Sequence, residues 1–457
     1  MYAYGTLNYL EYSRTIFFLG DMASETMTTK SDASADNQDL NNWKVGNFKT
    51  NGSLENFFKY AFIGVNRANA VIKKVPDAGF SQEQKDLFLG EAYFLRAWNY
   101  FNLVRNFGLV PLHKSVVETV DQTSTALAPD MDAMYDLILS DCRRAAELLP
   151  VYETPKIGRA DRVAAQALAA KAYLYVASAK EHGVKLYRDM HRDATVMYDS
   201  AAYFAGEVIE KQSVYGFESS LLDIYDVEKA RGKEHIFIMA MDRSGSSEGQ
   251  YSKISKMFIP YIDGATLYLK QGDKDEYIPT HDGWGEYQTT VAFYNTFDAS
   301  DKRKTELIVD KVYKADGTLL GEYPGKIPYP FCRKYIDPKF EGDKTSTRPF
   351  LLRFSDVALI YAEAAGPTAK AYELVNFIRS RAGLGDMKPN LGKDEFRREI
   401  LKERTFELAF EGDHVYDLRR WNRITTDVPE AAGLSEDQVT FYPIPQAEIN
   451  LNGSLRP

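Results

Sequence analysis

The chain has 457 residues, of which 44% are hydrophobic and 26% charged, and its formal net charge is −9. The composition excludes a disordered, collagen-like or coiled-coil chain, and the length predicts two domains or one large domain with insertions. The negative charge has the wrong sign for a general nucleic-acid binder. Two cysteines, Cys142 and Cys332, are too few for a disulfide framework or a four-cysteine zinc or iron–sulfur site.

The sequence predicts neither a membrane span nor an export signal. A membrane helix needs roughly 18 consecutive apolar residues, and the most apolar run, 163–179, contains Gln166 and Lys171. The first 14 residues, MYAYGTLNYLEYSR, lack a basic stretch followed by an apolar core. A chain trimmed at its N-terminus would have the same character.

Helical patterns dominate the first 212 residues. Ser81 and Gln84 have the spacing of a capping box and begin a strongly apolar helix that Gly108 ends. An alanine-rich helix begins near Asp161 and ends at Gly183. Weaker patterns predict helices over 54–75, 130–149 and 195–211.

The middle of the chain, 213–349, has a different texture. It is rich in Gly, Asp, Tyr, Lys and Pro, with strand-like runs at 235–241 and 307–313 and turn signals at Asp263-Gly264 and Asp316-Gly317. Helical patterns return at 356–365, 368–382 and 393–411. We therefore expect a helical frame that carries a long, loop-rich insertion, where binding residues tend to lie.

Three segments mix small and aromatic residues at helical spacing: 91–101, 170–179 and 358–365. This texture is typical of tetratricopeptide-type helix pairs, although the spacing is not a regular repeat of about 34 residues. The predicted fold is mainly α: irregular tetratricopeptide-like helix pairs form one scaffold, and a loop-rich insertion with short strands lies on the ligand face. We expect one compact unit with helical regions at 1–212 and 350–457 and a ligand-binding insertion at 213–349.

No pattern in the sequence indicates catalysis. The six histidines have no metal-ligand spacing, and P-loop, dinucleotide and Gly-x-Ser-x-Gly motifs are absent. We predict no catalytic residue, no metal site and no cofactor, and interpret His281-Asp282 as a solvated turn. Spacing alone leaves open a glycosidase, whose two carboxylates need no fixed separation in the sequence.

A dense ionic cluster lies near the C-terminus, interleaved with aromatic and leucine residues. Its members are Lys402, Glu403, Arg404, Glu407, Glu411, Asp417, Arg419 and Arg420. We favour a structural network of Arg–carboxylate pairs over an active site, because no nucleophile or His–acid pair accompanies it.

Aromatic residues in polar loops are the best functional lead. Trp43 lies between Asn42 and Lys44, and Trp284 lies between Asp282 and Tyr287. An exposed ring beside polar groups suits a sugar, because the ring covers the apolar C–H face while the neighbours bond hydroxyls. The predicted ligand-binding residues are Asn42, Trp43, Lys44, Tyr268, Asp282, Trp284 and Tyr287, with Tyr261 and Tyr277 nearby. The alternative for Trp284 is a ring that fills its own loop, and Trp98 and Trp421 are expected in the core.

Several segments resemble the SusD/RagB-type proteins of Bacteroidetes. They are GEAYFLRAWNYFNLVRNFGLVPL (90–112), GWGEYQTTVAFYNTFDASDKR (283–303), RFSDVALIYAEAA (353–365), AYELVNFIRSRAGL (371–384), LKERTFELAFEGDHVYDLRRW (401–421) and FYPIPQAEINLNGSL (441–455). The resemblance implies an outer-membrane lipoprotein that binds oligosaccharide, or in some members peptide, and delivers it to a SusC-like TonB-dependent transporter. It also places Trp43 and Trp284 where several members carry ligand-binding aromatics.

The sequence departs from the family pattern at three places. The signal peptide and lipidated cysteine are absent, so the expected cell-surface location and lipid anchor follow from the resemblance alone. His414 stands where the family more often has Arg, and the tail stops at Pro457. Two other functions stay open: a peptide-binding protein of the same architecture, and an intracellular helical-repeat adaptor that binds another protein.

Overall fold

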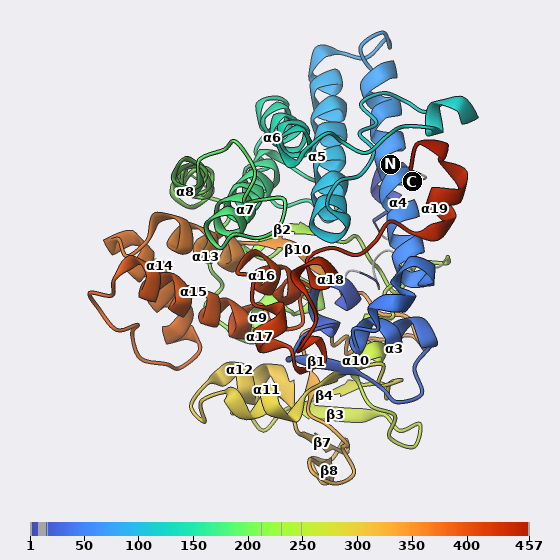
Figure 1. Cartoon of the computed structure of the whole chain (residues 1–457). Helices are drawn as coiled ribbons and strands as arrows, with labels where there is room; N and C mark the ends of the chain where they lie inside the picture. The colour runs from blue at the N-terminus through green and yellow to red at the C-terminus, as the bar shows by residue number, and fades with distance from the viewer. Residues whose placement is uncertain are drawn as a thin grey trace.

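A curved row of helices, each packed against the next, forms the frame of the molecule (Figure 1). In order along the row these are α4 (Gly52–Lys74), α5 (Gln82–Phe107), α6 (Met131–Leu148), α7 (Arg162–Glu181), α8 (Ala194–Lys211), α13 (Phe354–Ala365) and α14 (Ala369–Arg381). The computed structural model describes residues 2–7, 15, 17–211, 213–229, 231–247 and 249–455. Three positions discussed above lie outside these ranges. They are most of residues 1–14, which were considered as a signal peptide, residue 212, which ends the first predicted helical region, and the last residue, 457.

The helix boundaries follow from the capping residues. Ser81 Oγ accepts a hydrogen bond from Gln84 N at 3.3 Å, and Gln84 Oε1 accepts one from Ser81 N at 3.1 Å, which confirms the capping box. Gly108 ends α5 with φ of +68°, and Asp161 caps α7 by accepting from Ala164 N at 2.9 Å. The predicted helices in this region are confirmed to within a few residues.

The C-terminal helix α15 (Lys393–Glu407) is shorter than the predicted 393–411. Phe410 and Gly412 have φ of +68° and +82°, a left-handed backbone that an α-helix does not contain. The chain therefore turns at this point and enters α16 (His414–Arg420).

Helix α13 packs against α8 although the whole insertion separates them in sequence. Strand β2 (His235–Ile238) pairs antiparallel with β10 (Phe350–Arg353), so the two ends of the insertion meet beside the helical row. The predicted strand at 235–241 is confirmed but ends at Ile238. The chain therefore enters and leaves the insertion close to the same point of the helical frame. Helix α13 then continues the helical row directly after α8.

Short antiparallel strands build the rest of the insertion. A four-stranded sheet has the order β4 (Tyr277–Thr280), β3 (Leu267–Lys270), β7 (Lys311–Tyr313), β8 (Leu319–Glu322). Two further pairs are β6 (Ile308–Val309) with β9 (Phe331–Cys332) and β1 (Met27–Thr29) with β5 (Tyr287–Thr289). The single strand predicted at 307–313 is wrong, because β6 and β7 belong to different sheets and Leu307 ends a helix.

The remaining described elements are short or surround the frame. They are α1 (Tyr2–Gly5), η1 (Phe18–Met22), α3 (Ala35–Asn41), η2 (Val45–Thr50), η3 (Val120–Thr123), α9 (Leu221–Ile224), η4 (Val227–Lys229), α10 (Ile254–Phe258), α11 (Val291–Thr296), α12 (Lys302–Leu307), α17 (Ile424–Asp427), η5 (Pro429–Ala431), α18 (Glu436–Val439), α19 (Gln446–Leu451) and η6 (Gly453–Leu455). Among the described helices, none is long and apolar enough to cross a membrane.

One large hydrophobic core joins the two helical ends of the chain. It includes residues of α4 to α8, of β2 and β10, and of the C-terminal segment as far as Tyr442. Trp98 and Trp421 are buried, as predicted. The fold is therefore mainly α, with irregular helix pairs and a strand-containing insertion, as the sequence indicates.

Candidate functional site

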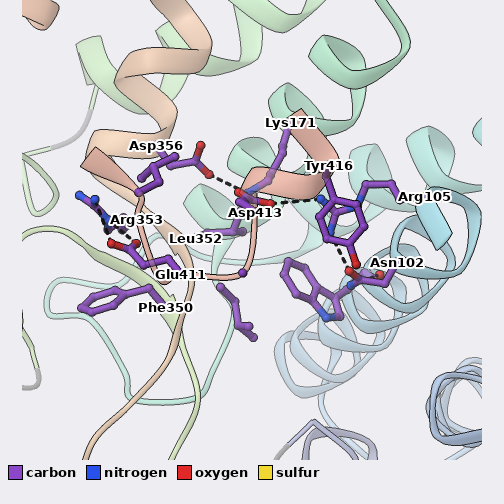
Figure 2. A pocket seen from close by; sticks show the side chains of 14 residues that line it. Asn102, Arg105, Lys171, Phe350, Leu352, Arg353, Asp356, Glu411, Asp413 and Tyr416 are labelled. Carbon is purple, nitrogen blue, oxygen red and sulfur yellow. Dashed lines mark hydrogen bonds and ion pairs between the residues drawn. The ribbon is translucent and has the colours of Figure 1, made fainter. Parts of the chain in front are cut away.

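The densest group of charged side chains is a buried network around α15 and α16, and Figure 2 shows part of it. Arg353 donates to Glu234 and Glu407, both at 3.0 Å, and to Glu411 at 2.7 Å. Arg404 donates to Asp356 at 2.8 Å and to Asp417 at 2.7 Å. These contacts join β10, α13, α15 and α16, segments that are distant in sequence.

This network is structural. Burial alone would raise the pKa of Glu407, but the guanidinium groups of Arg381 and Arg353 lower it to about 2, so Glu407 is an anion at neutral pH. The cavity in Figure 2 has a volume of about 30 Å³, room for about one water molecule and not for a sugar ring. Two members of the predicted cluster stand apart: Lys402 is exposed, and Arg419 donates to the Arg105 carbonyl at 3.2 Å.

The two predicted binding loops lie against each other. Strand β1 pairs with β5, placing Thr29 opposite Tyr287. Glu286 accepts three further hydrogen bonds from the N-terminal loop: its carbonyl from Lys30 N at 3.3 Å and Thr29 Oγ1 at 3.1 Å, and its carboxylate from Asn37 Nδ2 at 2.6 Å. The surface in this region is thus built from both loops.

Trp43 is not a surface platform. Its side chain is buried, its indole N–H donates to the Ala23 carbonyl at 3.1 Å, and its ring stacks near Tyr442. Trp43 follows α3 with φ of +49°, and its ring packs against Phe48 in the core. The prediction of an exposed ring here is wrong because a polar neighbourhood in sequence does not fix the direction of the side chain.

The polar neighbours of Trp43 are exposed. Asn42 donates to the Gln38 carbonyl at 2.7 Å, and Lys44 lies 3.4 Å from Asp39. Both therefore have local partners in α3 (Ala35–Asn41), and their exposed atoms remain available to a ligand on this surface.

Trp284 is exposed, and Tyr261 lies on the adjoining segment. The Trp284 residue is 39% exposed and the Tyr261 residue is 69% exposed. Three backbone hydrogen bonds hold the two segments together: Trp284 N to Lys256 O at 2.7 Å, Gly283 N to Pro260 O at 3.0 Å, and Gly285 N to Ile259 O at 2.9 Å. Two aromatic side chains are therefore presented to solvent from one rigidly paired loop.

Charged side chains flank these rings. Lys256 Nζ lies 5.9 Å from the centre of the Trp284 ring and pairs with Asp343 at 2.9 Å. Asp263 pairs with Lys326 at 3.2 Å. The two ion pairs cancel in charge and supply hydrogen-bond donors and acceptors from residues near this loop.

The other predicted site residues divide between supporting and core positions. Asp282 accepts from Gly264 N at 2.9 Å and Ile262 N at 3.4 Å, so it fixes the shape of the Tyr261 loop. Tyr268 is half-buried on β3 opposite Tyr313. Tyr287 is fully buried in a core cluster, and its prediction as a surface ligand is wrong because it faces inward from β5.

His281 is also buried and contacts Ser255 Oγ at 3.0 Å. The prediction of a solvated turn at this residue is therefore wrong. Within the part of the chain that the structure describes, no group of three or more His, Cys, Asp and Glu side chains is arranged to hold a metal ion.

Tyr261 is predicted from the sequence only as a neighbour of the ligand-binding residues and not as one of them. A signal for it exists, because Pro260 precedes it and the Asp263-Gly264 turn follows, which together indicate a loop tip. No local sequence pattern predicts that Asp343 pairs with Lys256 near Trp284, because the two residues are far apart in the sequence.

A helical row that carries a loop-rich insertion is also found in known proteins to which this chain is similar. A family described as "Starch-binding associating with outer membrane" matches residues 8–174, and the SusD family matches residues 313–439. SusD-like protein P2 from Formosa agariphila is 26% identical over 477 aligned positions, which cover 97% of this chain and 86% of that protein.

Solved structures share the fold along the whole chain. A laminarin-binding SusD-like protein has a TM-score of 0.78 and 24% identity, covering 98% of this chain and 95% of that one. Surface glycan-binding protein A from Bacteroides thetaiotaomicron, in complex with laminarihexaose, has a TM-score of 0.76 and 20% identity. The match covers 100% of this chain and 97% of that one. The chain is therefore similar to SusD-type proteins over most of its length and shares their fold.

Proposed function

We propose that this protein captures oligosaccharide or polysaccharide at the cell surface and delivers it to a SusC-like TonB-dependent transporter of the outer membrane. The observation that carries the proposal is the presentation of Trp284 and Tyr261 from one paired loop. Flat rings cover the apolar face of a sugar, and the neighbouring ion pairs offer partners for its hydroxyl groups.

The comparisons support glycan as the ligand class. One similar structure is named as laminarin-binding and another is a complex with laminarihexaose, and one matched family is described as starch-binding. The open position of the rings favours a binding protein over an enzyme, because the neighbouring carboxylates of Asp343 and Asp263 are each paired with a lysine. The outer-membrane location and the transporter partner rest on the similarity to SusD-type proteins alone.

Affinity electrophoresis in gels containing laminarin, starch or another polysaccharide tests capture. We expect one of these glycans to retard the wild-type protein. Trp284→Ala and Tyr261→Ala should each reduce the retardation, with a dissociation constant roughly tenfold higher than that of the wild type. Tyr203→Ala is a matched control for Tyr261→Ala, because Tyr203 is a similarly exposed tyrosine on α8 (62% against 69%). Equal retardation of all four proteins would contradict this assignment of the site.

Two further measurements separate the remaining functions. Release of reducing sugar from the retarding glycan would identify an enzyme and contradict the proposed role. Co-purification of the membrane-anchored protein with a TonB-dependent transporter tests delivery. Retention of a peptide, with no glycan retained, would favour the peptide-binding alternative.

A further inference from the structure

A second cavity, of about 600 Å³, lies among the segments that precede and follow β2 and the segment that precedes β10. It is lined largely by charged side chains, with more cations than anions: Lys229, Arg231, Arg243 and Arg348 against Glu218, Glu228 and Asp242. The site with Trp284 and Tyr261 shares none of these residues.

The carboxylates of this cavity already have donors. Glu228 accepts from Arg243 and Lys339, each at 3.0 Å, and these partners lower its pKa. Asp242 accepts from the hydroxyl group and the backbone N–H of Ser244, at 2.7 and 2.9 Å, and these two bonds lower its pKa. Glu218 accepts from Lys233 N at 2.7 Å. None of the three carboxylates is in salt-bridge contact with Arg348.

Arg348 forms no direct ion pair with a described carboxylate, although Asp242 and Asp337 lie near enough to interact with its charge. Its Nη1 donates to the Val227 carbonyl at 2.9 Å, and its Nε is buried with no hydrogen-bond partner among the described residues. No described carboxylate forms an ion pair with it, whereas the buried Arg353 is paired with three. Burial lowers the pKa of Arg348, and the charges of Asp242 and Asp337 offset this effect only in part.

We propose that this cavity binds an anionic group, a carboxylate or a sulfate, with Arg348 as its principal donor and the exposed Arg231 at its rim. The planar guanidinium group matches both anions in geometry, and the cavity is of a size that holds small ligands. The anion is either a free ion or the acidic group of a sugar. The inference is independent of the proposed glycan site, because it depends on a different cavity.

Calorimetric titration of the whole chain with sodium glucuronate, sodium sulfate and glucose tests the proposal. We expect saturable binding of glucuronate or sulfate, weakened at least about tenfold by Arg348→Gln. Arg144→Gln is the matched control, because it removes the same charge from an exposed surface pair with Glu147. Trp284→Ala should leave anion binding unchanged, so failure of this site is distinguishable from failure of the glycan site.

Arg348→Gln removes a hydrogen bond to Val227, so a second variant guards against a folding defect. Arg231→Gln changes only an exposed rim residue and should weaken anion binding by about twofold to fivefold. Binding of sulfate alone would identify a free anion, binding of glucuronate would identify a sugar acid, and either supports the site. No saturable binding of either anion, or equal losses in Arg348→Gln and Arg144→Gln, would overturn it.

Discussion

Trp43 and Trp284 lie on the two loops that β1 and β5 hold together, yet one ring is buried and the other is exposed. The Trp43 indole has a carbonyl partner at Ala23 and aromatic neighbours in the core, so its contribution is to stability. Trp284 is held in place through its backbone, which leaves its ring available. At the scale of single residues, the function of an aromatic side chain in this region depends on which side of the loop it occupies.

This difference predicts opposite effects of the two alanine substitutions. Trp43→Ala should lower the free energy of unfolding by about 3–5 kcal/mol, because it removes a large buried ring and leaves a cavity. Trp284→Ala should lower it by less than about 1 kcal/mol, because much of its ring is already in water.

Urea denaturation followed by circular dichroism measures both variants against the wild type. A larger loss of stability in Trp284→Ala than in Trp43→Ala would show that the ring of Trp284 fills its own loop. That result would remove Trp284 from the proposed glycan site.

The loop that carries Trp284 is shaped by close backbone contacts. A Cβ atom at Gly283 would lie 2.0 Å from the Ile259 carbonyl oxygen and 2.7 Å from that of Lys256. Since those carbonyl groups belong to the segment that pairs with 283–285, glycine at this position is what permits the pairing. At the scale of elements, the two exposed rings depend on this contact for their relative position.

Gly283→Ala should therefore weaken glycan binding without removing either ring. We expect a loss of at least about tenfold in affinity, since a shift of about 1 Å in a binding group disrupts a preorganised surface. Gly385→Ala is the control, because a Cβ atom there meets no other atom within 4 Å. Affinity electrophoresis with the retarding glycan compares the two, and unchanged binding in Gly283→Ala would show that the loop tolerates displacement.

The sequence predicts elements well where capping residues and long apolar patterns coincide, as at Ser81 and Asp161. It predicts poorly where a few residues are shared between sheets, as at β6 and β7, because strand partners are set by contacts distant in sequence. The site divides in the same way. The polar loop around Trp284 can be predicted from composition. The burial of Trp43 and Tyr287 and the position of Asp343 beside Lys256 depend on tertiary packing and cannot be predicted in this way.

Across the whole molecule, buried ion pairs connect the start of the insertion, the second helical region and the C-terminal segment. Glu234 lies next to β2, and Arg353 and Arg381 bind it together with Glu407 on α15. The N-terminal segment joins the same region through Asp21, whose carboxylate accepts from the backbone of Gly412 at 2.6 Å. These contacts stabilise the helical frame that carries the loop with Trp284 and Tyr261.

Asp21 and Glu407 give opposite pH dependences. Burial raises the pKa of Asp21 from 3.8 to about 6, so its contribution to stability is present below 3.8 and lost as pH rises through 6. The lowered pKa of Glu407, about 2 against an ordinary 4.5, makes its contribution present above 4.5 and lost as pH falls toward 2. A difference between wild type and a Glu407 variant isolates the second effect.

Glu407→Gln should lower the free energy of unfolding by about 3–5 kcal/mol at neutral pH, because it leaves Arg353 and Arg381 short of a counter-charge. The loss should shrink to less than about half near pH 3, where the unfolded wild type has already bound its proton. Denaturation curves at both pH values measure it, with Glu147→Gln as a surface control that should cost less than about 1 kcal/mol. A loss of the same size at both pH values would show that Glu407 stabilises the frame by packing and not by charge.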